Sequence, residues 1–192
     1  EQALYWLDID GRRIFRLDST GERTEWPTPF RVGCIAPRAG GGFIAGTEQG
    51  IADIDLSTGR FQLLFNPEEH LSHNRFNDGK VDRQGRFWAG TMDDRERGSA
   101  GTLYRIDPDL SWTAIDTGYG ITNGPAFSTD GRRMYHSDTL RRVTYVFDLA
   151  TDGNVSNRRI FLQFDETDGH PDGMTVYSAG CLWIAFWGGW CV

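Results

Sequence analysis

A repeat of aromatic strand segments most restricts how this chain of 192 residues can fold. Five segments rich in bulky apolar residues recur, and their second bulky residues are 38, 44, 47 and 48 positions apart. Hydrophobic and polar residues alternate within them, which is the pattern of half-buried β-strands. The segments span residues 4–9, 42–47, 85–91, 133–138 and 181–185.

A second strand segment that ends in an acidic turn follows four of these five segments, as in IADIDLSTG at residues 51–59. A period of about 40 to 50 residues with several strands per unit is typical of a β-propeller blade. The glycine, aspartate and asparagine residues of the turns suit tight hairpins. We therefore expect an all-β fold of the propeller type without helices, and an irregular β-sandwich is the alternative.

The length of the chain limits how many blades it can form. At about 45 residues per blade, 192 residues supply roughly four blades. The first unit begins at its second strand, the last stops soon after Trp183, and a propeller cut open exposes strand edges that proteins usually protect. We expect residues 1–192 to form a single propeller domain that is incomplete at both ends. A closed four-bladed ring is the alternative.

The composition of the chain limits which kinds of partner it can bind and which cellular compartment suits it. The net charge of −7 argues against a nucleic acid or an anionic membrane as the partner. No apolar run approaches the roughly 20 residues of a membrane-spanning helix, and the first residues lack the features of a signal peptide. Three widely spaced cysteines do not suggest a disulfide framework. We therefore expect a cytoplasmic protein with reduced cysteines, and the sequence does not indicate its oligomeric state.

Three polar residues lie in phase with the repeat. Asn77, Asn123 and Asp172 each precede an aromatic strand by 11 or 12 positions and are closely followed by glycine. Equivalent positions of successive propeller blades converge on the central axis, so these side chains can meet there. Their oxygens are hard ligands that suit Ca²⁺, Mg²⁺ or Mn²⁺, and Zn²⁺ also accepts carboxylate. Asn-Gly and Asp-Gly are also common turn dipeptides, so three ordinary turns are the alternative.

Other candidates for chemistry are weaker. The chain lacks a GxSxG nucleophile elbow, an HExxH motif and a Walker loop. We expect His70 and His73 in a solvated loop, His136 in a strand and His170 at the mouth of the site or in solvent. Asp138 either flanks Asn123 or ends a strand, and Lys80 is expected to make a structural salt bridge.

The chain resembles the regucalcin (senescence marker protein) and gluconolactonase family over essentially its whole length. The matching motifs follow the family's order and spacing, and together they are specific. They are residues 74–82 (NRFNDGKVD), 87–92 (FWAGTM), 121–124 (ITNG), 155–160 (VSNRRI), 171–174 (PDGM) and 182–185 (LWIA).

The resemblance implies a six-bladed propeller with one divalent metal ion in its central channel. It places Asn123 and Asp172 at metal-ligand positions, and Arg75 and Asn77 at substrate-binding positions. A third family ligand is a glutamate that would precede residue 1, and Glu1 does not match it. Arg95 stands where one branch of the family has a substrate-contacting glutamate, so we assign that role to the adjacent Asp94.

The resemblance also implies hydrolysis of a sugar lactone such as a gluconolactone. A metal ion, Ca²⁺, Zn²⁺, Mn²⁺ or Mg²⁺, can polarise the lactone carbonyl and lower the pKa of a bound water. Asp172 is the candidate catalytic residue because a carboxylate can take the proton from that water. The alternatives are a calcium-binding or regulatory propeller with little turnover, and a hydrolase of non-sugar lactones or phosphotriesters on the same scaffold.

Overall fold

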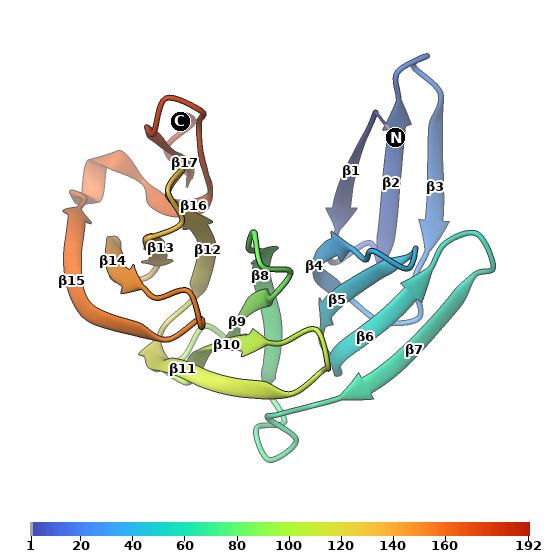
Figure 1. The fold of residues 1–192 in the computed structure, drawn as a ribbon, viewed down its shortest axis with the longest axis horizontal. Helices are drawn as coiled ribbons and strands as arrows, with labels where there is room; N and C mark the ends of the chain where they lie inside the picture. Colours follow the sequence, from blue (N-terminus) through green and yellow to red (C-terminus); the bar gives the residue numbers. More distant parts are fainter. Residues whose placement is uncertain (1) are drawn as a thin grey trace.

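The computed structural model describes residues 2–192, which fold almost entirely into β-strands. Seventeen strands form five antiparallel sheets that follow one another in an arc (Figure 1). In these residues, helical structure is limited to one 3-10 turn, Glu166–Asp168, and no helix is long and apolar enough to cross a membrane. The expected all-β, propeller-type fold is confirmed.

The five sheets have the strand order of propeller blades, with neighbours in the sheet also neighbours in the chain. The first sheet has three strands, the next three have four each, and the fifth has two. In chain order the sheets are β1 (Ala3–Asp8), β2 (Arg13–Asp18) and β3 (Arg23–Pro27); β4 (Val32–Pro37), β5 (Phe43–Thr47), β6 (Gly50–Asp55) and β7 (Arg60–Phe65); β8 (Asn74–Val81), β9 (Phe87–Asp93), β10 (Gly101–Ile106) and β11 (Trp112–Tyr119); β12 (Thr122–Phe127), β13 (Arg133–Asp138), β14 (Val143–Leu149) and β15 (Val155–Gln163); and β16 (His170–Val176) and β17 (Leu182–Trp187).

The aromatic segments of the sequence repeat form β1, β5, β9, β13 and β17. The segments that follow four of them form β2, β6, β10 and β14, and each pairs with its predecessor as an antiparallel hairpin. The burial of β1 alternates along the strand, whereas β5, β9 and β13 are buried along almost their whole length, because neighbouring sheets cover both of their faces.

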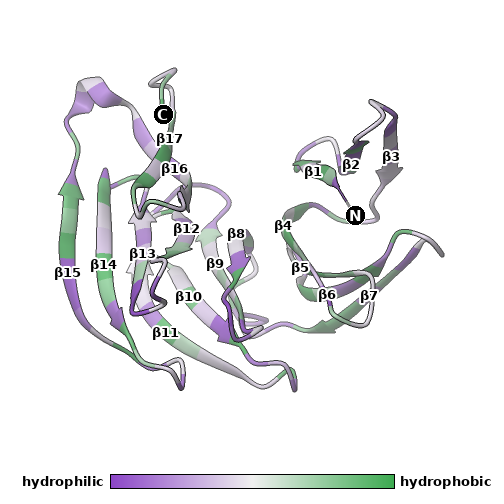
Figure 2. Ribbon diagram, turned by 45° about the horizontal axis from the view of Figure 1, so that its top comes forward, coloured by the Kyte–Doolittle hydropathy of each residue, from purple (hydrophilic) through white to green (hydrophobic). Residues whose placement is uncertain are grey.

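Four hydrophobic clusters hold the successive sheets together face to face. Between the third and fourth sheets, Trp88 and Leu103 pack against Met134 and Phe147, and all four are almost completely buried. Comparable clusters join the other neighbouring sheets. Figure 2 shows hydrophobic and hydrophilic bands following one another along many of the strands.

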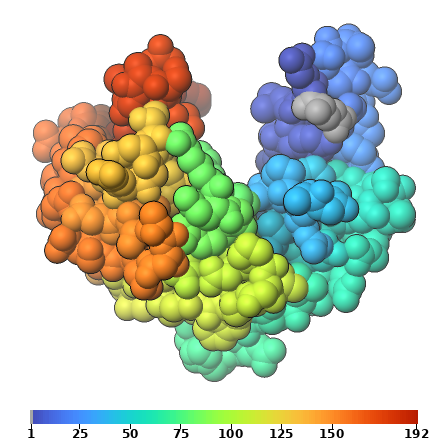
Figure 3. Space-filling view, in the orientation of Figure 1, coloured from blue at the N-terminus to red at the C-terminus, as the bar shows by residue number. Residues whose placement is uncertain are grey.

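The strands that open the second to fifth sheets line the inside of the arc. We call β4, β8, β12 and β16 the inner strands; β8 packs against β4 and β12, and β12 also packs against β16. In the space-filling view the molecule is hollowed between the first sheet and the C-terminal strands (Figure 3). The inner strands therefore bring segments from different blades close to one another.

A buried histidine makes the stability of this core sensitive to pH. His136 in β13 is fully buried, and neither ring nitrogen has a hydrogen-bond partner among residues 2–192. Its ring meets that of Tyr119 edge-on, with the centroids 4.9 Å apart. Burial lowers the pKa of His136 to about 3 because the charged imidazolium would be desolvated.

We expect the free energy of unfolding to fall as the pH drops from about 6.5, the pKa of histidine in an unfolded chain, toward 3. In this window the unfolded chain binds a proton that the folded chain excludes, which costs up to about 1.4 kcal/mol per pH unit. Urea unfolding at several pH values should show a flatter profile for His136→Phe than for the wild-type chain. Parallel profiles between pH 6.5 and 5 would contradict this assignment.

Candidate functional site

The polar residues predicted to line the channel lie at irregularities of the inner strands. The pairing register shifts in every inner strand, as in a β-bulge, which bends a strand and changes where its side chains point. In β8, β12 and β16 the shift falls at the predicted residue. The shifts fall between Val32 and Cys34, between Phe76 and Gly79, between Asn123 and Ala126, and between Pro171 and Met174.

Glycines at these irregularities let the inner strands approach one another. Gly124 has a φ of +88°, and a Cβ there would lie 3.1 Å from the sulfur of Met174 in β16. A Cβ at Gly79 in β8 would lie 2.7 Å from the carbonyl oxygen of Trp88 and 2.9 Å from the sulfur of Cys34 in β4, whereas a Cβ at Gly173 would make only an ordinary contact with Asp78 at 3.9 Å. The Asn-Gly and Asp-Gly pairs at the three predicted positions are therefore parts of strands. The turn alternative is wrong for them and holds for Asp130-Gly131, which lies in a turn.

The three predicted substrate-binding residues are hydrogen-bonded to one another. Nε of Arg75 donates to Oδ1 of Asp94 at 2.7 Å, and Nη1 donates to Oδ1 of Asn77 at 2.9 Å. The side-chain amide of Asn77 donates to the carbonyl of Thr122 at 2.9 Å, which links this group to β12. The structure thus joins residues from the third and fourth sheets in one polar group.

Sequence reasoning missed Arg31 and Glu48, which complete this group from the second sheet. Arg31 donates to both carboxylate oxygens of Asp94, at 3.0 and 2.8 Å, and its Nε donates to Glu48 at 2.7 Å. The hydrogen bonds from Arg31, and secondly from Arg75, lower the pKa of Asp94. These four side chains line a cavity of about 290 Å³ together with Arg95, which itself pairs with Asp93.

Asn123 and Asp172, the predicted metal ligands, stand on adjacent inner strands. Asn123 is buried, and its amide donates to Oγ1 of Thr139 at 2.7 Å. Thr139 in turn donates to the carbonyl of Pro171 at 2.8 Å, one residue before Asp172. Burial raises the pKa of Asp172, and a hydrogen bond from the backbone N–H of Gly173 opposes that rise.

The chemistry of these two residues fits a hard cation. No hydrogen bond from residues 2–192 is directed to Oδ1 of Asn123, so this oxygen is available to a ligand. It would act with the carboxylate of Asp172, and oxygen donors of this kind are those that Ca²⁺, Mg²⁺ and Mn²⁺ prefer. The described part of the chain contains no group of three or more His, Cys, Asp or Glu side chains placed to hold a metal ion. Residues 2–192 thus offer part of a donor set, and Glu1 lies outside the described residues.

Asp78 also belongs to the site, although sequence reasoning did not select it. Its carboxylate accepts the backbone N–H of Gly79 at 2.7 Å and that of Gly124 at 2.8 Å. Burial raises the pKa of Asp78 to about 6, and the charge of Asp172 adds a smaller contribution. The sequence signal was present, because Asp78 directly precedes Gly79 just as Asn123 and Asp172 directly precede glycine.

The four histidines and Asp138, the other candidates from the sequence, lie outside the hydrogen-bonded group formed by the predicted site residues. His70 and His73 lie in turns, and His136 lies in a strand, as expected. Asp138 ends β13, is fully buried, and accepts the backbone N–H of Gly120. His170 lies in β16, where its ring contacts the carbonyl of Thr139 and the guanidinium of Arg142. None of these side chains is hydrogen-bonded to the predicted site residues within residues 2–192.

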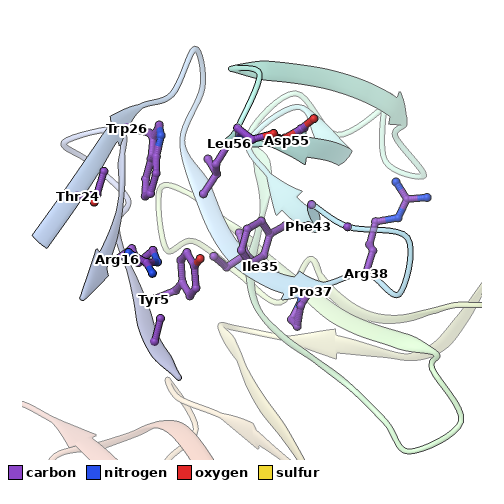
Figure 4. Close-up of a pocket in the computed structure, with 14 residues that line it drawn as sticks. Tyr5, Arg16, Thr24, Trp26, Ile35, Pro37, Arg38, Phe43, Asp55 and Leu56 are labelled. Atoms are coloured by element: carbon purple, nitrogen blue, oxygen red, sulfur yellow. Dashed lines mark hydrogen bonds between the residues drawn. The ribbon is translucent and has the colours of Figure 1, made fainter. Parts of the chain in front are cut away.

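A larger pocket of about 880 Å³, lined by both aromatic and polar side chains, lies between the first and second sheets (Figure 4). Tyr5, Trp26, Ile35 and Phe43 line it, and Arg38 stands at its edge. None of the predicted site residues contributes to it. The pocket is therefore separate from the polar group on the inner strands.

Comparisons with known proteins agree with this architecture. A family model described as the SMP-30/Gluconolactonase/LRE-like region matches residues 1–192. A 6-deoxy-6-sulfogluconolactonase of Pseudomonas putida is 38% identical over 187 residues, which are 96% of this chain and 64% of the relative. An L-arabinolactonase of Azospirillum brasilense is 36% identical, with 98% of this chain and 64% of the relative covered.

Among solved structures, a calcium-binding protein, regucalcin, of Agrobacterium tumefaciens superposes with a TM-score of 0.91 at 26% identity. The superposition covers 97% of this chain and 64% of that one. The chain thus spans a little under two thirds of the length of these three relatives. With its propeller-type sheets and a family match along its full length, the chain belongs to the SMP-30/Gluconolactonase/LRE-like family.

Proposed function

We propose that this chain carries the substrate-binding group and part of the cation site of a sugar-lactone hydrolase. The observation that carries the proposal is the convergence of Arg75, Asn77 and Asp94 into one hydrogen-bonded group, with Asn123 and Asp172 on the next two inner strands. The names of the two lactonase relatives support the same substrate class.

The polar group suits a ligand with several hydroxyls. Nε and Nη1 of Arg75 are engaged by Asp94, Asn77 and the carbonyl of Phe76, so within residues 2–192 its Nη2 is the nitrogen left to donate to a substrate oxygen. Asn77 offers an amide that is already oriented by Arg75 and by the carbonyl of Thr122. Because Asp94 is held by two guanidinium groups, it stays ionised and can accept a substrate hydroxyl.

Asp172 is the residue that we assign to proton transfer. Burial raises the pKa of its carboxylate when no cation is bound. In the proposed site this carboxylate would stand beside the attacking water, where it can act as the general base. It would accept the proton of the water that attacks the lactone carbonyl and return it as the ring opens.

Asn123 and Asp172 would hold the divalent cation through their oxygens. When bound, the cation would polarise the carbonyl and lower the pKa of water. The same donors also suit a calcium-binding propeller with little turnover, and the regucalcin of A. tumefaciens, titled a calcium-binding protein, favours this as the second candidate.

The proposal is tested by initial rates of D-glucono-δ-lactone hydrolysis in a pH-indicator assay. The protein would be treated with chelator and then supplied with Ca²⁺, Mn²⁺, Mg²⁺ or Zn²⁺, using residues 1–192 and a longer form continued at both ends. We expect turnover that the chelator removes and a divalent cation restores. Cation binding without turnover in either form would favour the second candidate, and turnover that survives chelation would contradict the cation site.

Replacing Arg31 with glutamine should raise KM for the lactone about tenfold or more, with a smaller effect on kcat. The substitution removes the two hydrogen bonds from Arg31 to Asp94, so that Asp94 is held by Arg75 alone. The side chains that would bind the substrate are then no longer fixed in one arrangement. Steady-state kinetics measures the change, and Arg95→Gln is the control because Arg95 lines the same cavity but pairs with Asp93. Equal effects of the two substitutions would contradict the role of Arg31.

A further inference from the structure

The chain contains a single lysine, Lys80, among its 20 lysine and arginine residues. Every other basic position is arginine, and most of the arginines lie at the surface or in ion pairs. Lys80 instead lies in the inner strand β8, two residues after Asp78. Its environment is partly buried, which lowers the pKa of its ammonium, while the nearby charge of Asp78 opposes that effect.

The ammonium of Lys80 reaches the backbone of another inner strand. Its Nζ donates to the carbonyl of Met174 in β16 at 3.0 Å, two residues after Asp172. The expected salt bridge is not formed, since no carboxylate of residues 2–192 lies within ion-pair distance of this ammonium. The Lys80 side chain therefore binds the backbone of β16 and not a carboxylate.

Asp78 and Lys80 together tie β8 to both of the other site-bearing strands. Asp78 accepts the N–H of Gly124 in β12, directly after Asn123. Since β12 packs against both β8 and β16, the bond from Lys80 is a link that passes β12 and joins the two strands on either side of it. It connects the strand that carries Asn77 to β16 at a point two residues after Asp172.

We propose that Lys80 is a positioning residue of the cation site formed by Asn123 and Asp172. It holds β16, and hence Asp172, at the place where Asp172 shares a cation with Asn123. The proposal rests on the proposed cation site. A compact ammonium on a long flexible stem can reach one carbonyl between closely packed strands, whereas the broad planar guanidinium used elsewhere in the chain needs more room.

Whether removal of Lys80 weakens or tightens cation binding distinguishes a positioning role from a purely electrostatic one. If Lys80 acted only through its charge, its removal would tighten cation binding, because one positive charge near the cation would be lost. If it only stabilised the fold, thermal stability would fall and the affinity of the folded protein would stay the same. A positioning role predicts weaker binding by the folded protein.

The test is terbium binding, followed by tryptophan-sensitised luminescence, with decay rates in H₂O and D₂O to count bound waters. We expect Lys80→Met to weaken Tb³⁺ binding at least tenfold and to leave more water on the ion. Lys80→Gln, which can still donate to the Met174 carbonyl, should recover part of the affinity. Arg83→Met is the matched control, because Arg83 also donates to a backbone carbonyl of the next sheet, that of Thr129, but away from the channel.

Three outcomes would overturn the proposal, and one of them also overturns the cation site. If Lys80→Met binds Tb³⁺ as tightly as the wild type or more tightly, and Asp172→Asn loses binding, the positioning role of Lys80 is contradicted and the cation site is not. The same holds if Arg83→Met weakens binding as much as Lys80→Met. A wild-type chain that binds no Tb³⁺, or binds it equally well after Asp172→Asn, contradicts the cation site and this inference with it. If Lys80→Met does not fold, Lys80→Leu, which also removes the donor, is measured in its place and interpreted in the same way.

Discussion

Replacing Asp172 with alanine should lower kcat for sugar-lactone hydrolysis about 10²- to 10⁴-fold, the usual contribution of a general base. The expected loss is large because this carboxylate has two assigned tasks, to accept a proton from water and to help hold the cation. Its partly buried position in β16, where burial raises its pKa when no cation is bound, would place it beside the attacking water. Asn123 on the adjacent strand supplies a neutral oxygen, which cannot replace the lost base.

Asp152→Ala is the matched control for this substitution. Asp152 also precedes a glycine, but its side chain is exposed in a turn between β14 and β15. Stopped-flow or pH-indicator kinetics would compare the two variants, with circular dichroism to show that both are folded. A folded Asp172→Ala protein that keeps most of the wild-type kcat would remove Asp172 from the mechanism.

Asp82→Ala should destabilise the fold by about 3 to 5 kcal/mol, because it leaves the buried guanidinium of Arg86 without its partner. Asp82 and Arg86 are 6% and 5% exposed, and Nε of Arg86 donates to Asp82 at 2.6 Å. The same carboxylate accepts the indole N–H of Trp88 at 2.9 Å. Arg86 further donates to the carbonyl of Thr151 at 3.0 Å, which ties the third sheet to the fourth.

Urea unfolding measures this loss, and Glu25→Ala is the comparison. Glu25 pairs with Arg13 and Arg23 at the surface, where an ion pair contributes only about 0 to 1 kcal/mol. We expect the midpoint of Asp82→Ala to shift far more than that of Glu25→Ala. Similar shifts for the two variants would show that the buried network adds little to stability.

The central strands of each sheet could be predicted from the sequence because their alternation and spacing are local signals. Segments such as residues 85–91 and 133–138 carry apolar residues at the period of a strand, and they form β9 and β13. The inner strands could not be recognised as strands in this way. Their Asn-Gly and Asp-Gly pairs have the composition of turns, and only the packing of neighbouring blades shows that Gly79 and Gly124 are needed for close approach.

The site was predictable in part for the same reason. Asn77, Asn123 and Asp172 were found because they share a phase with the repeat, and the structure places all three on inner strands. Arg31 was not found, because its partner Asp94 is 63 residues away and ion pairs between blades leave no pattern in the chain. The carboxylate of Asp78 was overlooked beside Asn77, although its distance from the following glycine matches the other two sites.

The most direct test of the central claim, that β12 and β16 share one cation site beside Asn77 of β8, is paramagnetic mapping by NMR. Mn²⁺ would be added in substoichiometric amounts to the ¹⁵N-labelled protein, and the broadening of each backbone amide signal would be followed. We predict that the amides of Asn123, Gly124, Asp172 and Gly173 broaden first, followed by that of Asn77. Broadening confined to surface carboxylates such as Asp18 and Asp55, with these five signals unchanged, would contradict the claim.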